Sequence, residues 1–121
     1  AQRLLNEAAR YLGTPYVWGG YSPSGFDCSG FVSYCLTNSG VRNTGRLTAQ
    51  GLYDICTPVS QSEAQPGDLI FFTGTYDAGV PVTHIGIYVG NGQMIHCGHP
   101  VQYTSINSPY WQSHFYGFGR W

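Results

Sequence analysis

The sequence predicts an α+β fold, in which helices near the amino terminus pack on a central antiparallel sheet. Over the first third of the chain, apolar residues recur at spacings of three and four, the period of an amphipathic helix. After residue 66 they come instead in short runs bounded by Gly, Pro and Asn, as in strands and turns. Helices that precede a group of strands are typical of α+β domains.

Three helices are predicted in the first half of the chain. The first covers residues 1–12 and ends at Gly13, a residue that favours helix C-termini. The second begins at Cys28, with Asp27 as its N-cap, and runs to about residue 36. The third is short and runs from the capping residue Thr48 to about Ile55.

The second half predicts a buried strand and a hairpin. The turn at residues 66–68 precedes the apolar run Leu69–Phe72, which predicts a buried strand. The hairpin joins residues 84–89 to residues 93–96 through Gly90, Asn91 and Gly92. Residues 101–121 are expected to pack back on the sheet as a last strand plus loops.

The composition excludes several classes of function. A chain of 121 residues is expected to form one domain, residues 1–121. Only 9% of the residues are charged, there is no lysine and the net charge is −1, so a surface for nucleic acid or an anionic membrane is not expected. No apolar run approaches the roughly 20 residues of a membrane span. The chain opens at Ala1 within a helical pattern, which suggests a domain excised from a longer protein.

Cys28 is the first candidate for chemistry. A cysteine in the first turn of a helix faces unsatisfied N–H groups and the positive end of the helix dipole, which favour the thiolate. A structural cysteine is a small buried hydrophobe, and that interpretation suits Cys35 in mid-helix. Cys28 instead follows a Gly/Pro/Ser-rich loop and has Asp27 and Ser29 as small polar neighbours. It is therefore the candidate nucleophile.

The loop of the hairpin decides whether His84 and His96 can meet. A two-residue Asn91-Gly92 turn would place the two histidines on opposite faces of the sheet. A three-residue loop, or a bulge, shifts the pairing of the two strands by one residue. Gly86 then lies opposite His96, and His84 lies diagonal to His96 on the same face of the sheet. We therefore predict an odd-length loop or a bulge near residues 90–92.

These side chains fit a catalytic relay. Cys28 would be the nucleophile, His84 the general base, and His96 the group that orients His84. A lone histidine on a strand is more often a structural residue, but two on one face beside a helix-start cysteine favour catalysis. Zinc binding by His96, Cys97 and His99 is the competing interpretation; strand alternation separates Cys97 from His96, and no second ligand pair exists.

Four segments, in order along nearly the whole chain, resemble the NlpC-type cell-wall endopeptidases. They are Tyr16-Val17-Trp18-Gly19-Gly20, Asp27-Cys28-Ser29-Gly30-Phe31-Val32, Pro66-Gly67-Asp68-Leu69-Ile70-Phe71-Phe72, and His84-Ile85-Gly86-Ile87-Tyr88-Val89-Gly90-Asn91-Gly92 followed by His96. The resemblance implies a papain-like fold and assigns Cys28, His84 and His96 as nucleophile, base and orienting residue. It further implies that Tyr16 supports the oxyanion and that Asp27 and Ser29 bind substrate. Trp18 lies close to the nucleophile in the sequence and is expected to line the same side of the cleft and bind substrate.

The reaction that the resemblance implies is hydrolysis of the γ-D-glutamyl to diamino-acid bond in peptidoglycan stem peptides. It requires no cofactor and no metal, the partner is the stem peptide rather than nucleic acid or a membrane, and the domain is expected to be a monomer. The location is expected to be extracellular or in the cell wall. A peptidoglycan amidase or acyltransferase of the same superfamily, and a non-catalytic wall-binding module, are the alternative functions.

Overall fold

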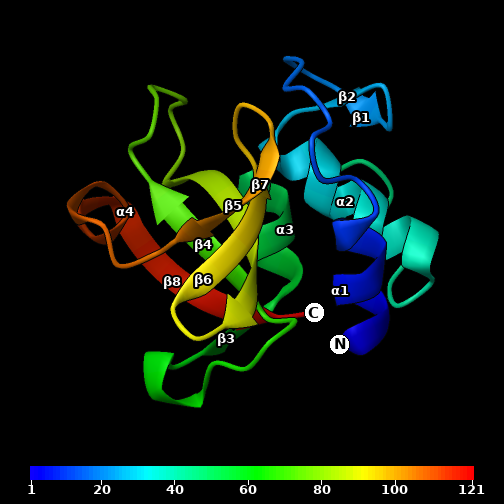
Figure 1. Cartoon of the computed structure of the whole chain (residues 1–121). Helices are drawn as coiled ribbons and strands as arrows, with labels where there is room; N and C mark the ends of the chain where they lie inside the picture. Colours follow the sequence, from blue (N-terminus) through cyan, green and yellow to red (C-terminus); the bar gives the residue numbers. More distant parts are fainter.

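A computed structural model describes all 121 residues, and its centre is a six-stranded antiparallel sheet. The order of the strands in this sheet is β3-β8-β4-β5-β6-β7. Their bounds are β3 Thr57–Val59, β4 Leu69–Thr73, β5 Val82–Gly90, β6 Gln93–Cys97, β7 Val101–Ser105 and β8 Phe115–Arg120. Three helices lie together beside the sheet, and α4 (Pro109–His114) lies apart from them near β8 and β4 (Figure 1). The predicted α+β class is confirmed.

The three amino-terminal helices are α1 (Gln2–Ala9), α2 (Cys28–Ser39) and α3 (Ala49–Ile55). Helix α1 is shorter than predicted, because its last turn loosens before Gly13, where φ is +87°. The predicted N-caps of α2 and α3 are confirmed: Asp27 accepts from the Gly30 N–H and Thr48 from the Gly51 N–H. Between α1 and α2 the chain forms a small ribbon of β1 (Tyr21–Ser22) and β2 (Gly25–Phe26), and a 3₁₀ turn covers Gln61–Glu63.

Alternation along the strands divides the apolar residues between two clusters. The larger cluster contains Leu69, Phe71 and Ile85 from the sheet and packs against Phe31 and Leu36 of α2. The smaller cluster lies on the opposite face of the sheet. Its buried members are Ile70, Phe72, Met94, Ile106 and Phe118, and Trp111 of α4 packs against it.

The carboxy-terminal region contains more regular structure than a last strand plus loops. It forms β7, α4 and β8, and β8 inserts between β3 and β4. The expected last strand is present as β8, but β7 and α4 were not predicted. In β7 only Val101 is buried, and α4 is only six residues long, with Pro109 at its start. Tertiary pairing, not local pattern, defines both elements.

The strands of the hairpin pair in the predicted register. Asn91 and Gly92 form the turn, with φ of +54° and +73°, and an extra residue is accommodated as a bulge between Tyr88 and Gly90. The bulge pairs Ile87 with Ile95, so that His84 and His96 lie on the same face. The prediction of a bulge near residues 90–92 is therefore confirmed.

Candidate active site

The N-terminus of α2 places Cys28 beside strand β5. The Asp27 carboxylate accepts from the Gly30 N–H at 2.7 Å and so holds the first turn. Gly30 is needed here, because a methyl group at this position would overlap the Gly20 carbonyl oxygen. The loop that precedes the helix is thus packed directly on its first turn, which fixes the direction in which Cys28 points.

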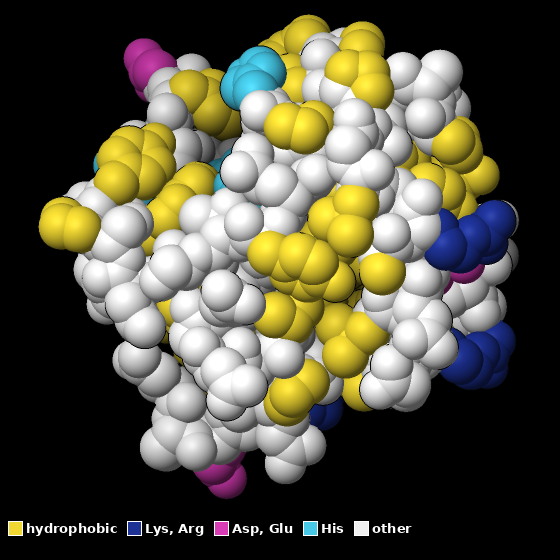
Figure 2. All heavy atoms as spheres, in the orientation of Figure 1, with side chains coloured by type: hydrophobic (Ala, Val, Ile, Leu, Met, Phe, Trp, Pro, Cys, Tyr) yellow, Lys and Arg dark blue, Asp and Glu magenta, His cyan; other side chains and the backbone are white.

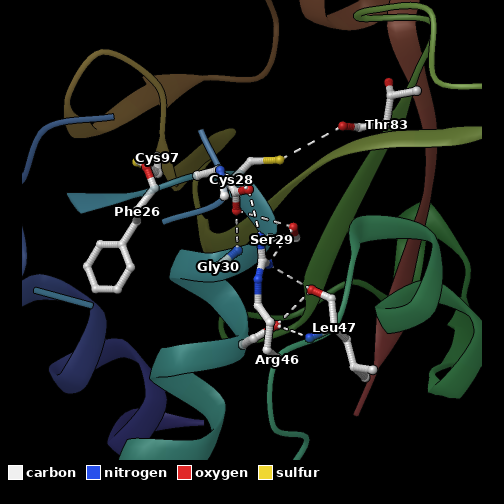
Figure 3. A network of polar contacts seen from close by, with 11 residues as sticks. Phe26, Cys28, Ser29, Gly30, Arg46, Leu47, Thr83 and Cys97 are labelled. Atoms are coloured by element: carbon white, nitrogen blue, oxygen red, sulfur yellow. Dashed lines mark hydrogen bonds and ion pairs between the residues drawn. The ribbon is translucent and has the colours of Figure 1, made fainter. Parts of the chain in front are cut away.

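The Cys28 thiol is 8% exposed and lies against the backbone on both sides of His84. Sγ donates to the Thr83 carbonyl at 3.8 Å, and Figure 3 shows the sulfur pointing from α2 toward that oxygen. The Ile85 backbone approaches the same sulfur, in the part of β5 that β6 leaves unpaired. No hydrogen bond joins Cys28 to the His84 ring.

The expected thiolate is not the favoured form of Cys28. Burial raises the pKa of the thiol to about 11, and the Asp27 charge adds to this effect. Backbone hydrogen bonds from Ser29 and Ile85, together with Arg46, lower the pKa by less. Desolvation therefore outweighs the helix N-terminus, and the expectation that the helix alone would favour thiolate was wrong.

The two histidines on the shared face form a hydrogen-bonded chain. His84 Nε2 and His96 Nδ1 are 2.9 Å apart, and their ring planes meet at 84°. The other nitrogen of His96, Nε2, lies 2.9 Å from the Thr104 hydroxyl on β7. Both nitrogens of His96 are thus engaged, whereas His84 keeps Nδ1 free for another partner.

Burial keeps both imidazoles neutral. It lowers the pKa of His84 to about 3, with a further contribution from His96, and it lowers the pKa of His96 to about 4. With Cys28 protonated, the resting site at neutral pH holds a neutral thiol and a neutral imidazole. Such a pair can act by general-base transfer of the thiol proton, without a preformed ion pair.

A cleft of about 580 Å³ opens in front of Cys28. The residues expected to bind substrate, Trp18, Asp27 and Ser29, all lie in its wall with Tyr16. Trp18 is 74% exposed and meets Tyr76, from the loop before β5, edge to face at 5.7 Å between ring centroids. The structure therefore brings all four of these residues into the wall of the cleft that Cys28 also lines.

The Asp27 carboxylate is fully engaged. Besides the Gly30 N–H, it accepts from Arg46 Nη2 at 2.7 Å and from the Gly19 N–H at 3.1 Å. Arg46 also donates to the Ser29 hydroxyl at 2.9 Å, a contact visible in Figure 3. Asp27 is therefore an ion-paired helix cap within the cleft wall.

Tyr16 supplies a hydroxyl donor near the thiol. Burial raises the pKa of Tyr16 to about 12, and the neighbouring Cys28 and Asp27 act in the same direction. Its ring packs on His99 at 4.7 Å between centroids. The phenol therefore keeps its proton at neutral pH and can donate a hydrogen bond.

The other cysteines, including Cys97 of the zinc interpretation, lie apart from the two histidines. All four thiols are free. Cys97 points to the face opposite His96, where its Sγ donates to the Phe26 carbonyl at 3.2 Å. No three His, Cys, Asp or Glu side chains gather closely enough to hold a metal ion. Cys35 is buried, as predicted.

Three residues of the site were not found from the sequence. Thr104 ends the histidine chain, Arg46 pairs with Asp27, and Trp111 stacks on His84 with 5.2 Å between centroids. The separation along the chain from the partner is 8 residues for Thr104 and His96 and 19 residues for Arg46 and Asp27, and Trp111 lies in α4 whereas His84 lies in β5. Only Trp111 carried a signal, since a tryptophan in a tail rich in aromatic residues indicates packing.

One face of the molecule carries few charges. Hydrophobic and uncharged side chains cover most of the face shown in Figure 2, and the dark-blue Arg side chains lie mainly at one edge. No helix combines the length and the apolarity that a bilayer span demands.

The chain matches the model of the NlpC/P60 family over residues 13–120. It is 44% identical over 121 residues to the bifunctional muramidase/DL-endopeptidase CwlT of Bacillus subtilis, covering 98% of this chain and 36% of that protein. A solved NLP/P60 lipoprotein-like structure from Staphylococcus aureus superposes with a TM-score of 0.92 at 44% identity, covering 98% of this chain and 40% of that one. The NlpC/p60 domain of the peptidoglycan hydrolase SagA superposes with a TM-score of 0.77 at 36% identity, covering 98% and 95%. Sequence and fold thus agree, and the chain belongs to the NlpC/P60 family.

Proposed function

We propose that this chain is a catalytic domain that hydrolyses peptidoglycan stem peptides as a cysteine endopeptidase. The observation that carries the proposal is the position of Cys28, at the N-terminus of α2 and against the β5 backbone that bears His84. The family relatives that are named endopeptidases support this reaction class; one of them, of which this chain spans about a third, is named a DL-endopeptidase. The bond to be cleaved would be that between γ-D-glutamate and the diamino acid.

The hydrogen-bonded chain suggests how the thiol is activated. If Thr104 accepts from His96 Nε2–H, then His96 Nδ1 accepts from His84 Nε2–H, and the lone pair of His84 Nδ1 is left to accept a proton. The thiol would turn from the Thr83 carbonyl toward Nδ1 as substrate enters, and its proton would pass to His84 while sulfur attacks the γ-carbonyl carbon. His84 would then return the proton to the leaving amine, and water would hydrolyse the thioester.

The oxyanion would meet two donors. The Cys28 backbone N–H takes part in no hydrogen bond of the chain, since it is the first residue of α2. The Tyr16 hydroxyl, protonated at neutral pH, is the second candidate. Preorganised donors of this kind are each worth about 10²-fold or more in kcat.

The cleft wall suggests which stems are accepted. Because Asp27 is already paired with Arg46, we propose that it caps α2 and does not meet a substrate ammonium. Stems whose amino-terminal alanine is acylated, as in intact wall, should then be cut as well as free ones. The test is the ratio of kcat/KM for free and N-acetylated stem tetrapeptide. A strong preference for the free amine would contradict this assignment of Asp27.

The proposed reaction needs no cofactor and no metal, and its partner is the stem peptide rather than nucleic acid or a membrane. The place of action would be the cell wall, outside the cell, and the domain would act as a monomer. The decisive experiment is digestion of purified peptidoglycan with product analysis by mass spectrometry. A new amino terminus on the diamino acid is expected; free lactyl-muramic acid would instead identify an amidase.

Variants connect the product to the site. Cys28→Ala and His84→Ala should reduce hydrolysis to background, because they remove the nucleophile and its base. Cys56→Ala, at a half-buried thiol outside the cleft, is the matched control and should retain activity. Wall binding without hydrolysis by the wild-type chain would refute the enzymatic proposal and indicate a wall-binding module.

A further inference from the structure

The indole of Trp111 covers the two histidines of the site. It stacks on His84 with 5.2 Å between centroids and 28° between planes, and it meets His96 edge to face at 5.3 Å and 87°. Phe72 of β4 supports both rings: its centroid lies 4.7 Å from that of Trp111 and 6.0 Å from that of His84. The base is therefore held in an aromatic enclosure rather than by charged groups.

Helix α4 holds the indole in this position. The helix has only six residues, but Ser108 caps it, accepting from the Trp111 N–H, and the Gln112 side chain donates to the Ile106 carbonyl at 2.7 Å. At its other end, His114 Nδ1 lies 2.7 Å from the Thr73 carbonyl oxygen of β4. These contacts tie α4 to the segment that follows β7 and to strand β4, which keeps Trp111 over His84.

We propose that Trp111 is a positioning residue for the general base: its indole face fixes the His84 ring with Nε2 toward His96 and excludes water from the pair. This inference rests on the proposed function, since it concerns the same base. An apolar aromatic face suits both states of the ring, because it desolvates neutral imidazole and attracts the imidazolium that forms during the reaction.

Among the neighbours of the His84 ring, Trp111 is the one that stacks on its face. From β6 the titratable neighbour is His96, whose Nδ1 lies 2.9 Å from His84 Nε2. From α2 it is Cys28, whose Sγ lies against the Thr83 carbonyl next to His84 in β5. Strand β4 contributes Phe72 and no charge. On α4, His114 turns toward the Thr73 carbonyl and packs on Tyr110. No carboxylate hydrogen-bonds to either histidine, so aromatic packing and the single histidine contact set the orientation of the base.

The test compares Trp111→Leu, which keeps apolar volume but loses the aromatic face, with Trp111→Phe, which keeps a smaller face. The Leu variant should lose about 10-fold or more in kcat, with KM changed by less than about 3-fold, because a misaligned base affects the chemical step. The Phe variant should recover most of this loss. Trp121→Leu is the matched control, since Trp121 bonds to the Gly67 carbonyl, away from the site, and its activity should match the wild type.

A second readout separates positioning from mere stability. NMR titration should show the pKa of His84 rising by about one unit or more in Trp111→Leu, because water reaches the ring, and kcat/KM should acquire an acid limb absent from the wild type. Unchanged kcat and an unchanged His84 titration in a folded Leu variant would overturn the inference, even if the melting temperature falls. If the Leu variant does not fold, Trp111→Met replaces it with the same expectations, since Met adapts to irregular space.

The two proposals fail in different ways. If Cys28→Ala and His84→Ala remain active, the proposed function is wrong, and the Trp111 result is then judged by the NMR titration alone. If those variants are inactive while Trp111→Leu keeps full kcat and an unchanged His84 pKa, only the role of Trp111 is wrong.

Discussion

Acid should destabilise this fold through the two histidines of the site, in a pH range where protonation of the carboxylates still changes the stability little. Burial lowers the pKa of His84 to about 3 and that of His96 to about 4, against 6.5 for an ordinary histidine. Between these values the unfolded chain binds protons that the folded chain does not, so the free energy of unfolding falls as the pH falls. The full contribution is present above pH 6.5 and is lost progressively toward pH 4 and below.

The magnitude follows from proton linkage. Each histidine that is protonated only in the unfolded chain costs about 1.4 kcal/mol per pH unit, so each should cost about 2 kcal/mol between pH 7.5 and pH 5. The two together should remove about 4 kcal/mol, a large part of the 5–15 kcal/mol that is typical of domain stability. The Trp111 stack and the contact between the rings are what keep the two side chains from protonating.

The assay is urea unfolding at pH 7.5, 6 and 5 for the wild type and three variants. His84→Gln and His96→Gln should each reduce the pH dependence by about half, whatever their effect at pH 7.5. His99→Gln is the matched control, since His99 is exposed, and it should keep the wild-type pH dependence. Equal stability of the wild type at pH 7.5 and pH 5, or a pH dependence that survives replacement of both His84 and His96, would refute the reasoning.

Three further predictions concern the site and its support. Gly30→Ala should lower the free energy of unfolding by about 3 kcal/mol or more, because the added methyl group overlaps the Gly20 carbonyl. Gly117→Ala is the control: its methyl group meets no neighbour within 4 Å, so the free energy of unfolding should change by no more than about 0.5 kcal/mol. Similar urea midpoints for the two variants would contradict the contact between Gly30 and Gly20. Thr104→Val should lower kcat about 10-fold with little change in KM, because His96 loses the hydroxyl that lies 2.9 Å from its Nε2. Thr104→Ser keeps a hydroxyl and should have nearly the kcat of the wild type. Full activity in the Val variant would show that Thr104 does not act through His96. The rate of Cys28 alkylation should keep rising above pH 9, because burial raises the pKa of the thiol to about 11, and a plateau near pH 6 would instead indicate a preformed thiolate.

The elements that the sequence predicted well are those with short-range physical causes. Asp27 and Thr48 cap helices because their side-chain oxygens reach an N–H three residues on, and the structure has both bonds. The parity of the hairpin followed from the period of two along a strand and from glycines that allow positive φ. Together these local rules brought Cys28 to a helix start and both histidines to one face.

The elements that the sequence did not predict depend on distant contacts. Strand β7 and helix α4 are too short and too weakly patterned to be defined locally, and they form because β6 and β4 offer partners. Arg46 gave no signal, since an isolated arginine in a loop carries no periodicity. Its ion pair with Asp27 spans 19 residues and exists only after α2 and the following loop have packed.

The sequence by itself determined the fold class, the capped start of α2 and the face that the two histidines share, because these follow from backbone geometry over a few residues. Only the tertiary structure decided the protonation of the site. Solvent exclusion at Cys28, at 8% exposure, and around His84 reverses the charge state that a helix N-terminus alone would favour. Desolvation is a property of everything packed around a group, including Trp111 from the far end of the chain, and so no local pattern could have specified it.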